Sequence, residues 1–335
     1  MAIDLSFRGR SLRILLTGAT GFLGNNLLRL LLEDGHEVAV TYRNSSDQRT
    51  LRDLAVEKVE CDLMEPASVI QALANVELVI HSAAMIQIGW SKLEQSRRVN
   101  VEATRQLAQA ARLHEIRMIH VSTVDALAPG SVDCPATEND IEPSKPPCSY
   151  VVSKREAEFA FAEQVSAGLD GVIVSPGFMI GPWDWRPSSG EMMLAIAKQF
   201  TPLAPRGGCS AVDVRDVACG IIAAIEHGRP GHNYILGGEN VSYYDLWTRM
   251  ARVVGSRPPI GKLPGFINWS AGKVGDLIGG ISRNEPLVNS AATEMGSLTH
   301  WYSSQKAMQE LGYQIGDVDT AMADAWDWFK SYGYA

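Results

Sequence analysis

Two residues in the middle of the chain have the types and the spacing of an acid–base pair. Tyr150 and Lys154 are four residues apart in a stretch predicted as a helix, so both side chains lie on one face. A free phenol has a pKa of about 10 and is a poor proton donor or acceptor near neutral pH. A neighbouring ammonium group stabilises the phenolate and lowers that pKa. The pair therefore predicts proton transfer at Tyr150, assisted by Lys154.

The same spacing occurs a second time, so spacing alone does not identify the catalytic pair. Tyr302 and Lys306 are also four residues apart, but no Ser/Thr-containing strand is predicted before them. Tyr150 lies instead between two predicted strands, one ending at Ser122 and one starting at Gly171. We interpret the second pair as incidental.

A glycine-rich turn near the start of the chain has the pattern of a phosphate-binding site. A predicted strand, residues 12–17, runs into the sequence GATGFLG at 18–24, which opens a predicted helix. Glycine lets the backbone approach an anion, and the free N–H groups and dipole at the start of a helix favour negative charge. The turn predicts dinucleotide binding, with the contacts Gly18, Thr20, Gly21, Phe22, Leu23 and Gly24.

The residue after the second predicted strand bears on the choice of dinucleotide. Sites selective for NAD usually carry Asp or Glu about 20 residues beyond the glycines, where it bonds the ribose hydroxyls. This chain has Arg43 there, followed by Asn44 and two serines. A guanidinium group can pair with a 2′-phosphate, which a carboxylate would repel. The sequence therefore favours NADP, with NAD as the alternative.

The composition narrows the class of partner. The 335-residue chain has 30 Lys and Arg against 38 Asp and Glu, a formal net charge of −8 at pH 7. Because no compact basic tract is present, neither a nucleic-acid nor a membrane partner is expected. The five cysteines include no C-x-x-C pair, which argues against a disulfide framework or a zinc site. No metal is expected, and without the apolar segment of a signal peptide the predicted location is cytoplasmic.

Predicted strands and helices alternate up to residue 175. The strands are residues 12–17, 37–42, 56–61, 76–81, 117–122 and 171–175, and the helices are 22–34, 67–74, 97–114 and 150–167. This alternation is typical of a parallel sheet with helices on both faces, which binds ligands at the carboxyl ends of its strands. The predicted fold class is α/β, a Rossmann-type doubly wound parallel sheet.

The regular alternation stops after residue 175. Residues 177–208 are rich in Gly, Pro and Trp, and residues 258–304 are expected to be irregular with broken helices. A helix is still predicted within 212–227, a strand at 233–236 and a helix at 242–254. We predict an NADP-binding Rossmann domain of residues 1–178 and 211–240. Residues 179–210 and 241–335 would form a smaller, discontinuous substrate-binding lobe.

An ordered series of short motifs runs along most of the chain. They are GATGFLG at 18–24, DL at 62–63, HSAA at 81–84, NV at 100–101, VST at 121–123, YVVSK at 150–154, SPGFMIGP at 175–182, VDVRDVA at 212–218 and ILGG at 235–238. In this order they resemble the extended short-chain dehydrogenase/reductase superfamily, also called the NAD-dependent epimerase/dehydratase superfamily. Within it, the chain looks most like the dihydroflavonol-4-reductase-like proteins.

The resemblance implies roles for individual residues. Thr123 would bond the substrate oxygen and hold it against Tyr150, while Lys154 would also bond the nicotinamide ribose. Asp62 would bond the adenine amino group, and Asp216 resembles a structural helix cap. The other implied cofactor contacts are Leu63, Ser82, Ala83, Ala84, Ser122, Tyr150, Lys154, Pro176, Gly177, Phe178 and Met179. Asn100 would orient the active-site helix, join a proton relay or simply bond neighbouring backbone.

The resemblance implies a reductase more than a sugar-nucleotide enzyme. Sugar-nucleotide members often have Tyr-Gly shortly after the catalytic Ser/Thr, where this chain has Leu127 and Ala128. Dehydratases typically follow the threonine with Asp-Glu, whereas Thr123 is followed by Val124 and Asp125. We expect an NAD(P)-dependent oxidoreductase that uses NADPH to reduce a ketone or aldehyde. A nucleotide-sugar epimerase or dehydratase and a non-catalytic NADP-binding sensor remain the alternatives.

Apolar and aromatic residues near the expected nicotinamide site favour a hydrophobic small-molecule carbonyl substrate. They are Met85, Ile86, Ile88, Trp90, Phe178, Trp183 and Trp185, with Phe266 and Trp269 in the later lobe, although each also fits ordinary core packing. The predicted helices 97–114 and 150–167 have alanine-rich faces that are compatible with a homodimer.

Overall fold

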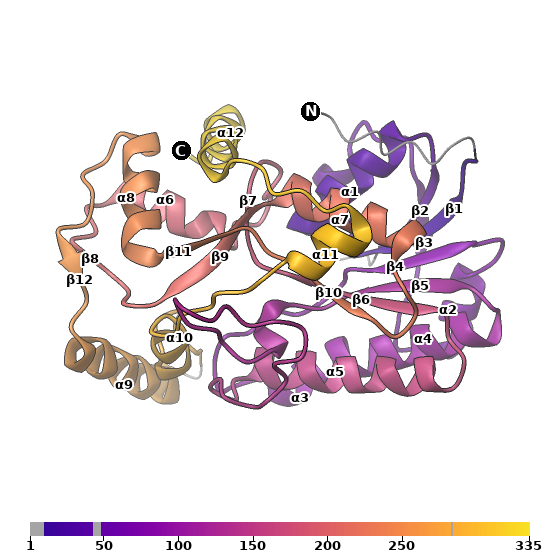
Figure 1. Cartoon of the computed structure of the whole chain (residues 1–335), viewed down its shortest axis with the longest axis horizontal. Helices are drawn as coiled ribbons and strands as arrows, with labels where there is room; N and C mark the ends of the chain where they lie inside the picture. The colour runs from indigo at the N-terminus through magenta and orange to yellow at the C-terminus, as the bar shows by residue number, and fades with distance from the viewer. Residues whose placement is uncertain (1–9, 43–47, 283) are drawn as a thin grey trace.

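The computed structural model describes residues 10–42, 48–282 and 284–335 (Figure 1). Its centre is a seven-stranded sheet in the order β10-β6-β5-β4-β1-β2-β3, in which all neighbouring strands are parallel. The strands are β1 (Arg13–Thr17), β2 (Glu37–Tyr42), β3 (Glu57–Glu60), β4 (Leu78–His81), β5 (Arg117–Val121), β6 (Gly171–Pro176) and β10 (Asn233–Leu236). The predicted Rossmann-type doubly wound sheet is confirmed.

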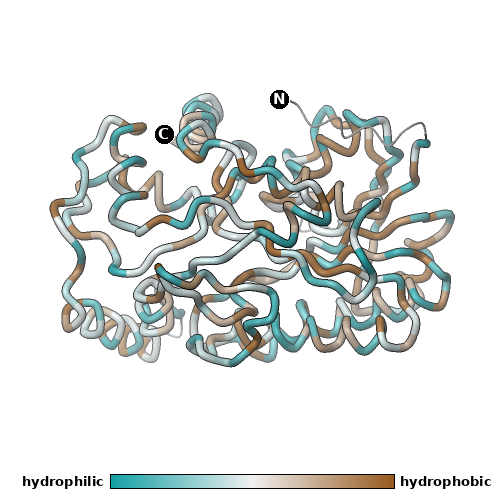
Figure 2. Tube along the Cα trace, viewed as in Figure 1, coloured by the Kyte–Doolittle hydropathy of each residue, from teal (hydrophilic) through white to brown (hydrophobic). Residues whose placement is uncertain are grey.

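Helices cover both faces of this sheet. On one face lie α1 (Phe22–Glu33) and α7 (Val214–His227), and on the other lie α2 (Pro66–Ala72), α4 (Ala103–Leu113) and α5 (Ser149–Ser166). Along β1, Ile14 and Leu16 pack toward the first layer and Leu15 toward the second. Strands buried on both faces are continuously apolar, as parallel sheets require, and Figure 2 shows hydrophobic stretches along these strands.

The strand order reverses between β1 and β4. From this point the chain runs outward through β2 and β3 on one side and through β5, β6 and β10 on the other. In such sheets the loops at the carboxyl ends of the two central strands diverge and leave a crevice for a ligand. The glycine turn follows β1 and the HSAA segment ends β4, so both lie at this crevice.

A second group of elements lies beside the sheet. Strands β7 (Phe178–Ile180), β9 (Gly208–Asp213) and β11 (Glu239–Ser242) form a three-stranded sheet, packed by α6 (Gly190–Lys198), α8 (Tyr243–Val254) and α12 (Val318–Ser331). Strands β8 (Leu203–Ala204) and β12 (Gly261–Lys262) pair in parallel. The shorter helices are η1 (Gln48–Leu51), α3 (Leu93–Ser96), η2 (Arg97–Glu102), η3 (Val124–Ala126), α10 (Ser290–Met295) and α11 (Gln305–Leu311). The domain boundaries given above stay a prediction.

Residues 258–304 are more regular than the sequence pattern indicated. They contain α9 (Gly265–Ser282), a continuous helix of 18 residues. Five glycines lower the intrinsic helix propensity of this segment, which is why a broken helix was expected. None of the helices in the described ranges has both the length and the apolar character needed to cross a bilayer.

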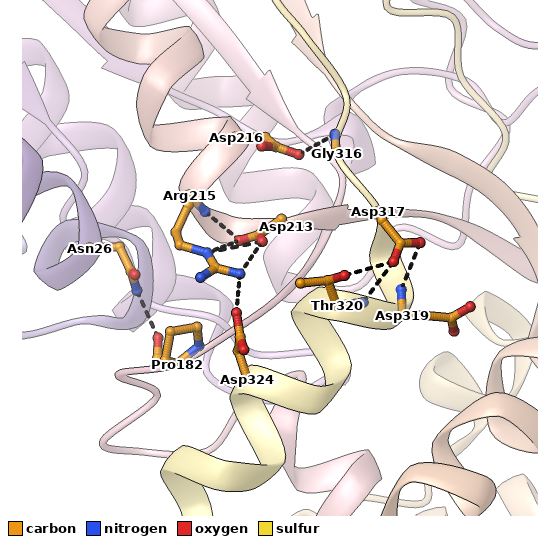
Figure 3. Close-up of polar contacts among 10 residues, drawn as sticks. All are labelled: Asn26, Pro182, Asp213, Arg215, Asp216, Gly316, Asp317, Asp319, Thr320 and Asp324. Atoms are coloured by element: carbon orange, nitrogen blue, oxygen red, sulfur yellow. Dashed lines mark hydrogen bonds and ion pairs between the residues drawn. The ribbon is translucent and has the colours of Figure 1, made fainter. Parts of the chain in front are cut away.

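A polar network joins the C-terminal helix α12 to the start of α7 (Figure 3). The Arg215 guanidinium group contacts the carboxylates of Asp213 and, in α12, Asp324, at 2.6 and 2.7 Å. Asp213, not Asp216, is the N-cap of α7, because its side chain accepts a hydrogen bond from the Arg215 N–H. Asp216 instead accepts a hydrogen bond from the Gly316 N–H at 2.7 Å. Both aspartates therefore have structural bonds, which agrees with a structural interpretation of this motif.

Candidate active site

The glycine turn after β1 is closely packed on the backbone around it. Gly18 has φ = +77°, and its carbonyl oxygen accepts the Gly21 N–H at 2.9 Å. A Cβ atom at Gly24 would lie 2.1 Å from the Gly18 oxygen, and one at Gly18 would lie 2.7 Å from the Ala83 nitrogen. Because side chains are excluded at both positions, the turn leaves the start of α1 accessible to an anion, as a dinucleotide phosphate needs.

The turn and the end of β4 are joined through Thr17. The Ser82 N–H donates to the Thr17 carbonyl oxygen at 3.3 Å, and the Ala83 N–H donates to its hydroxyl oxygen at 3.2 Å. Ala84 is exposed just beyond. The structure therefore brings together two of the predicted cofactor-binding segments, residues 18–24 and 82–84, which are far apart in the sequence.

The other predicted cofactor residues are spread along the same edge of the sheet. Asp62, after β3, has an exposed side chain whose Oδ1 accepts the Met64 N–H at 3.0 Å, and Leu63 beside it is half-buried. Pro176 is buried at the end of β6, and Gly177, Phe178 and Met179 are half-buried at the start of β7. Thr20 and Phe22 are half-buried and Leu23 is buried in α1. Arg43 lies outside the described residues.

The three candidate catalytic residues meet at the carboxyl end of β5. Tyr150 is buried near the start of α5, and its phenol is hydrogen-bonded to the Thr123 hydroxyl. Thr123 caps η3, since its Oγ1 also accepts the Asp125 N–H at 3.2 Å. Burial, followed by the negative charge of Asp125, raises the pKa of Tyr150 above its usual value. The phenol therefore keeps its proton near neutral pH, which is the form that a proton donor needs.

Lys154 is held one helical turn from Tyr150 by the backbone of β5. Its Nζ is buried and donates to the Val121 carbonyl oxygen at 2.8 Å. Burial lowers the pKa of Lys154 to about 8, against an opposite effect of the Glu158 carboxylate. The expected lowering of the Tyr150 pKa is not what this structure has, because desolvation of the phenol has the larger effect.

Comparison with known proteins agrees with this geometry. Residues 14–237 match the model of the NAD dependent epimerase/dehydratase family. The chain belongs to this family. The match covers the glycine turn, the whole candidate catalytic set and all but the last residue of the ILGG motif.

Relatives that match over nearly their whole length carry reductase or lipid-related names. A putative dihydroflavonol 4-reductase of Synechocystis is 32% identical over 95% of this chain and 94% of its own. Sterol demethylase protein B of Methylococcus capsulatus is 30% identical, with 95% and 98% covered. The crystal structure of gox2253 superimposes with a TM-score of 0.84 at 33% identity, covering 96% of this chain and 98% of that one. The protein is an NAD(P)-dependent oxidoreductase of the extended short-chain dehydrogenase/reductase type.

Glu158 is a site residue that the sequence analysis missed. It follows Lys154 by four residues in α5, so Tyr150, Lys154 and Glu158 occupy one helix face. Its carboxylate accepts the hydroxyl hydrogen of Ser122, the predicted cofactor contact at the end of β5. Burial raises the pKa of Glu158, and the bond from Ser122 opposes this effect. The four-residue spacing was the available signal, and no motif of the family drew attention to it.

A buried charged cluster behind Thr123 was also missed. Lys145 Nζ donates to the Val124 carbonyl oxygen at 2.8 Å, to Asp125 Oδ1 at 3.1 Å and to the Tyr302 hydroxyl at 2.7 Å. His300 Nδ1 lies 3.4 Å from the same Asp125 oxygen. Lys145 and His300 hold the pKa of Asp125 below its usual range despite burial. Lys306 instead donates to the Asn233 carbonyl oxygen at 2.8 Å, so Tyr302 and Lys306 do not act on one another.

Asn100 binds the segment that covers Tyr150. Its side-chain oxygen accepts the Met85 N–H at 2.7 Å, and its amide donates to the Met85 carbonyl oxygen at 3.0 Å and to Ser153 Oγ at 2.9 Å. The Tyr150 N–H in turn donates to the Gln87 carbonyl oxygen at 3.1 Å. Asn100 therefore bonds neighbouring backbone, and it also links that segment to α5.

Proposed function

We propose that the protein reduces a ketone or aldehyde carbonyl on a hydrophobic small molecule, with NADPH as the reductant and Tyr150 as the proton donor. The observation that carries the proposal is the hydrogen-bonded pair of Tyr150 and Thr123, with Lys154 one turn along the same helix. The pair lies at the carboxyl edge of the sheet after β5, the strand next to the β1/β4 crevice, which supports the proposal. A sheet of this kind without a proton donor at that position would bind the dinucleotide but not reduce a carbonyl.

Each side chain of the proposed site has a defined role in the reaction. A bound nicotinamide supplies the hydride. Thr123 donates a hydrogen bond to the carbonyl oxygen and holds it against the Tyr150 hydroxyl, which gives that oxygen its proton. The Lys154 ammonium group stabilises the phenolate that forms and bonds the ribose. Ser122 and Glu158 bond one another beside Lys154 and hold that edge of the site in place.

Apolar side chains close to Tyr150 support a hydrophobic substrate. The Tyr150 N–H donates to the carbonyl oxygen of Gln87, and the residues on either side of Gln87 are Ile86 and Ile88. Both isoleucine side chains are more than a third exposed, so they offer apolar surface to a ligand. The names of the two relatives given above point the same way, since both refer to polycyclic, largely apolar molecules. Trp183 and Trp185 support the proposal less, because their ring centroids lie 4.9 to 6.0 Å from those of Trp328 and Tyr332 in the lobe.

The proposed activity is tested with a panel of carbonyl compounds, followed by the loss of NADPH absorbance at 340 nm. We expect turnover of apolar and aromatic ketones or aldehydes, and none of nucleotide sugars. Turnover of nucleotide sugars alone would support the epimerase/dehydratase alternative. Tight NADPH binding without turnover of any carbonyl would instead support a sensor.

The proposed NADP preference depends on Arg43. Replacing Arg43 with alanine removes the cation that would pair with the 2′-phosphate, so NADPH affinity should fall about tenfold or more while NADH affinity changes little. Fluorescence titration of both cofactors measures this difference. Arg52→Ala, an exposed arginine beyond η1, is the matched control and should leave both affinities unchanged. Equal affinity of the wild type for the two cofactors would contradict the assignment.

A further inference from the structure

Helix α9 presents an apolar face to solvent. The helix lies at one end of the molecule, away from the central sheet (lower left in Figure 1). Besides Trp269, which lines a groove, six of its large apolar side chains are between 39% and 78% exposed, namely Phe266, Ile267, Val274, Leu277, Ile278 and Ile281. Their spacing of three and four residues puts them on one side of the helix. Ile260 before the helix and Leu287 after it are also exposed, at 77% and 86%.

The opposite face of α9 is firmly docked on the protein. A Cβ atom at Gly272 would lie 2.4 Å from Thr293 Oγ1, and one at Gly275 would lie 1.8 Å from the Val288 carbonyl oxygen. Asn268 donates from its side-chain amide to the Thr293 carbonyl oxygen at 2.9 Å. Because glycines and hydrogen bonds hold the inner face, the large side chains are left to point outward in the folded state.

The charged residues of α9 also differ between its inner and its outer face. Its one acidic residue, Asp276, is partly buried and accepts the Ser290 N–H at 2.9 Å, so it is directed toward the protein. Lys273 is exposed beside the outward apolar residues, with its Nζ 3.8 Å from Asp276 Oδ2, and Lys262 is exposed just before the helix. A basic and apolar face on a chain of net charge −8 is suited to an anionic surface with an apolar interior.

The area of this face argues against a second copy of the chain as its occupant. A helix of 18 residues is about 27 Å long and about 10 Å across, so one face offers roughly 300 Å². Stable protein interfaces bury about 800 Å² on each partner. A bilayer has no such minimum, since a convex apolar helix can lie in its interfacial region with its axis in the membrane plane.

A groove lies between α9, α10 and residues 143–146. It has a volume of about 470 Å³ and is lined by Asn268 and Trp269 of α9, by residues of α10 and by Lys145. Lys145 donates to the carbonyl oxygen of Val124, the residue after Thr123. The groove therefore lies beside a lysine that bonds the residue after Thr123, but its lining does not include Thr123, Tyr150 or Lys154.

We propose that the outward face of α9 docks on a lipid bilayer, with its apolar side chains in the interfacial region and Lys262 and Lys273 at anionic headgroups. The helix lies on the membrane and does not cross it. The net negative charge of the whole chain led us to expect no membrane partner, and the local charge at α9 reverses that expectation. Docking goes beyond the proposed reductase activity and does not depend on it.

Sedimentation with lipid vesicles tests this proposal. The full chain should sediment with vesicles of phosphatidylglycerol and phosphatidylethanolamine, and less with vesicles of phosphatidylcholine alone. A Leu277→Ser and Ile281→Ser double variant should reduce the bound fraction at least tenfold. Leu113→Ser with Ile141→Ser removes equally exposed apolar side chains elsewhere and is the matched control, expected to bind like the wild type. Lys273→Gln should weaken binding to the anionic vesicles about fivefold.

Other outcomes would overturn the proposal. No sedimentation of the wild type, or equal sedimentation of the α9 double variant, would exclude docking through α9. A dimer in analytical ultracentrifugation that the α9 variant dissociates, without vesicle binding, would assign the face to a second copy. Thermal unfolding of each variant shows that it is folded. Carbonyl turnover without lipid is measured separately, so failure of docking and failure of the proposed reaction are distinguishable.

Discussion

Replacing Tyr150 with phenylalanine should lower carbonyl turnover by about 100-fold to 10,000-fold, the range that a positioned general acid contributes. Phenylalanine keeps the ring that packs with Cys148, Ala291 and Met295 and removes only the hydroxyl. The hydrogen bond to Thr123 is lost with it, and no other proton donor is built into the proposed site at that position. The substrate carbonyl would then bind without a group to give its oxygen a proton.

The measurements are kcat with NADPH, the dissociation constant of NADPH and the midpoint of thermal unfolding. We expect a large fall in kcat and small changes in the other two, because the ring and the glycine turn are unaltered. Tyr332→Phe is the matched control, since Tyr332 is half exposed and its ring stacks on Trp328 with centroids 4.7 Å apart. If Tyr150→Phe turned over at the wild-type rate, Tyr150 would not be the proton donor.

Replacing Gly24 with alanine should weaken NADPH binding by about 100-fold or more. The new methyl group would lie 2.1 Å from the Gly18 carbonyl oxygen and 2.7 Å from its carbonyl carbon, far inside contact distance. These are backbone atoms, so relief requires the glycine turn to open and the N–H groups at the start of α1 to move. Overpacking of this kind also costs about 1–3 kcal/mol of folding stability.

The matched control is Gly280→Ala in α9. A Cβ atom at Gly280 meets nothing within 4 Å, so alanine should leave NADPH binding unchanged and raise stability by up to about 1 kcal/mol. Fluorescence titration with NADPH and thermal unfolding, run on both variants, separate loss of the turn from loss of the fold. A Gly24→Ala protein that binds NADPH like the wild type would show that the cofactor phosphate is not held at this turn.

The central sheet could be predicted closely because its signals are local. Continuous apolar runs such as residues 13–17 identify buried strands, and the observed strands match the predicted ones to within two residues at each end. The parallel direction of the strands followed from the alternation with helices, since a parallel neighbour requires a crossover. The glycine turn was equally predictable, because the absence of a side chain is itself a feature of the sequence.

Local sequence signals did not predict helix α9 or the orientation of its apolar face. Its glycines looked like helix breakers in isolation, yet in the fold Gly272 and Gly275 are contact points with residues 288–293. The orientation of its apolar side chains depends on which face those glycines dock. A pattern of glycine and apolar residues does not say whether the apolar face will be buried or left in solvent.

The amino-acid sequence thus settled the sheet, the family and the residues that meet at its carboxyl edge, because turns, strand periodicity and short motifs depend on neighbours in the chain. Tertiary structure decided the surroundings of those residues. The bond from Lys145 to Tyr302 joins positions 157 residues apart, and burial, followed by the charge of Asp125, raises the pKa of the Tyr150 phenol. Such contacts and desolvation arise only when distant segments pack together, and a single stretch of sequence does not reveal them.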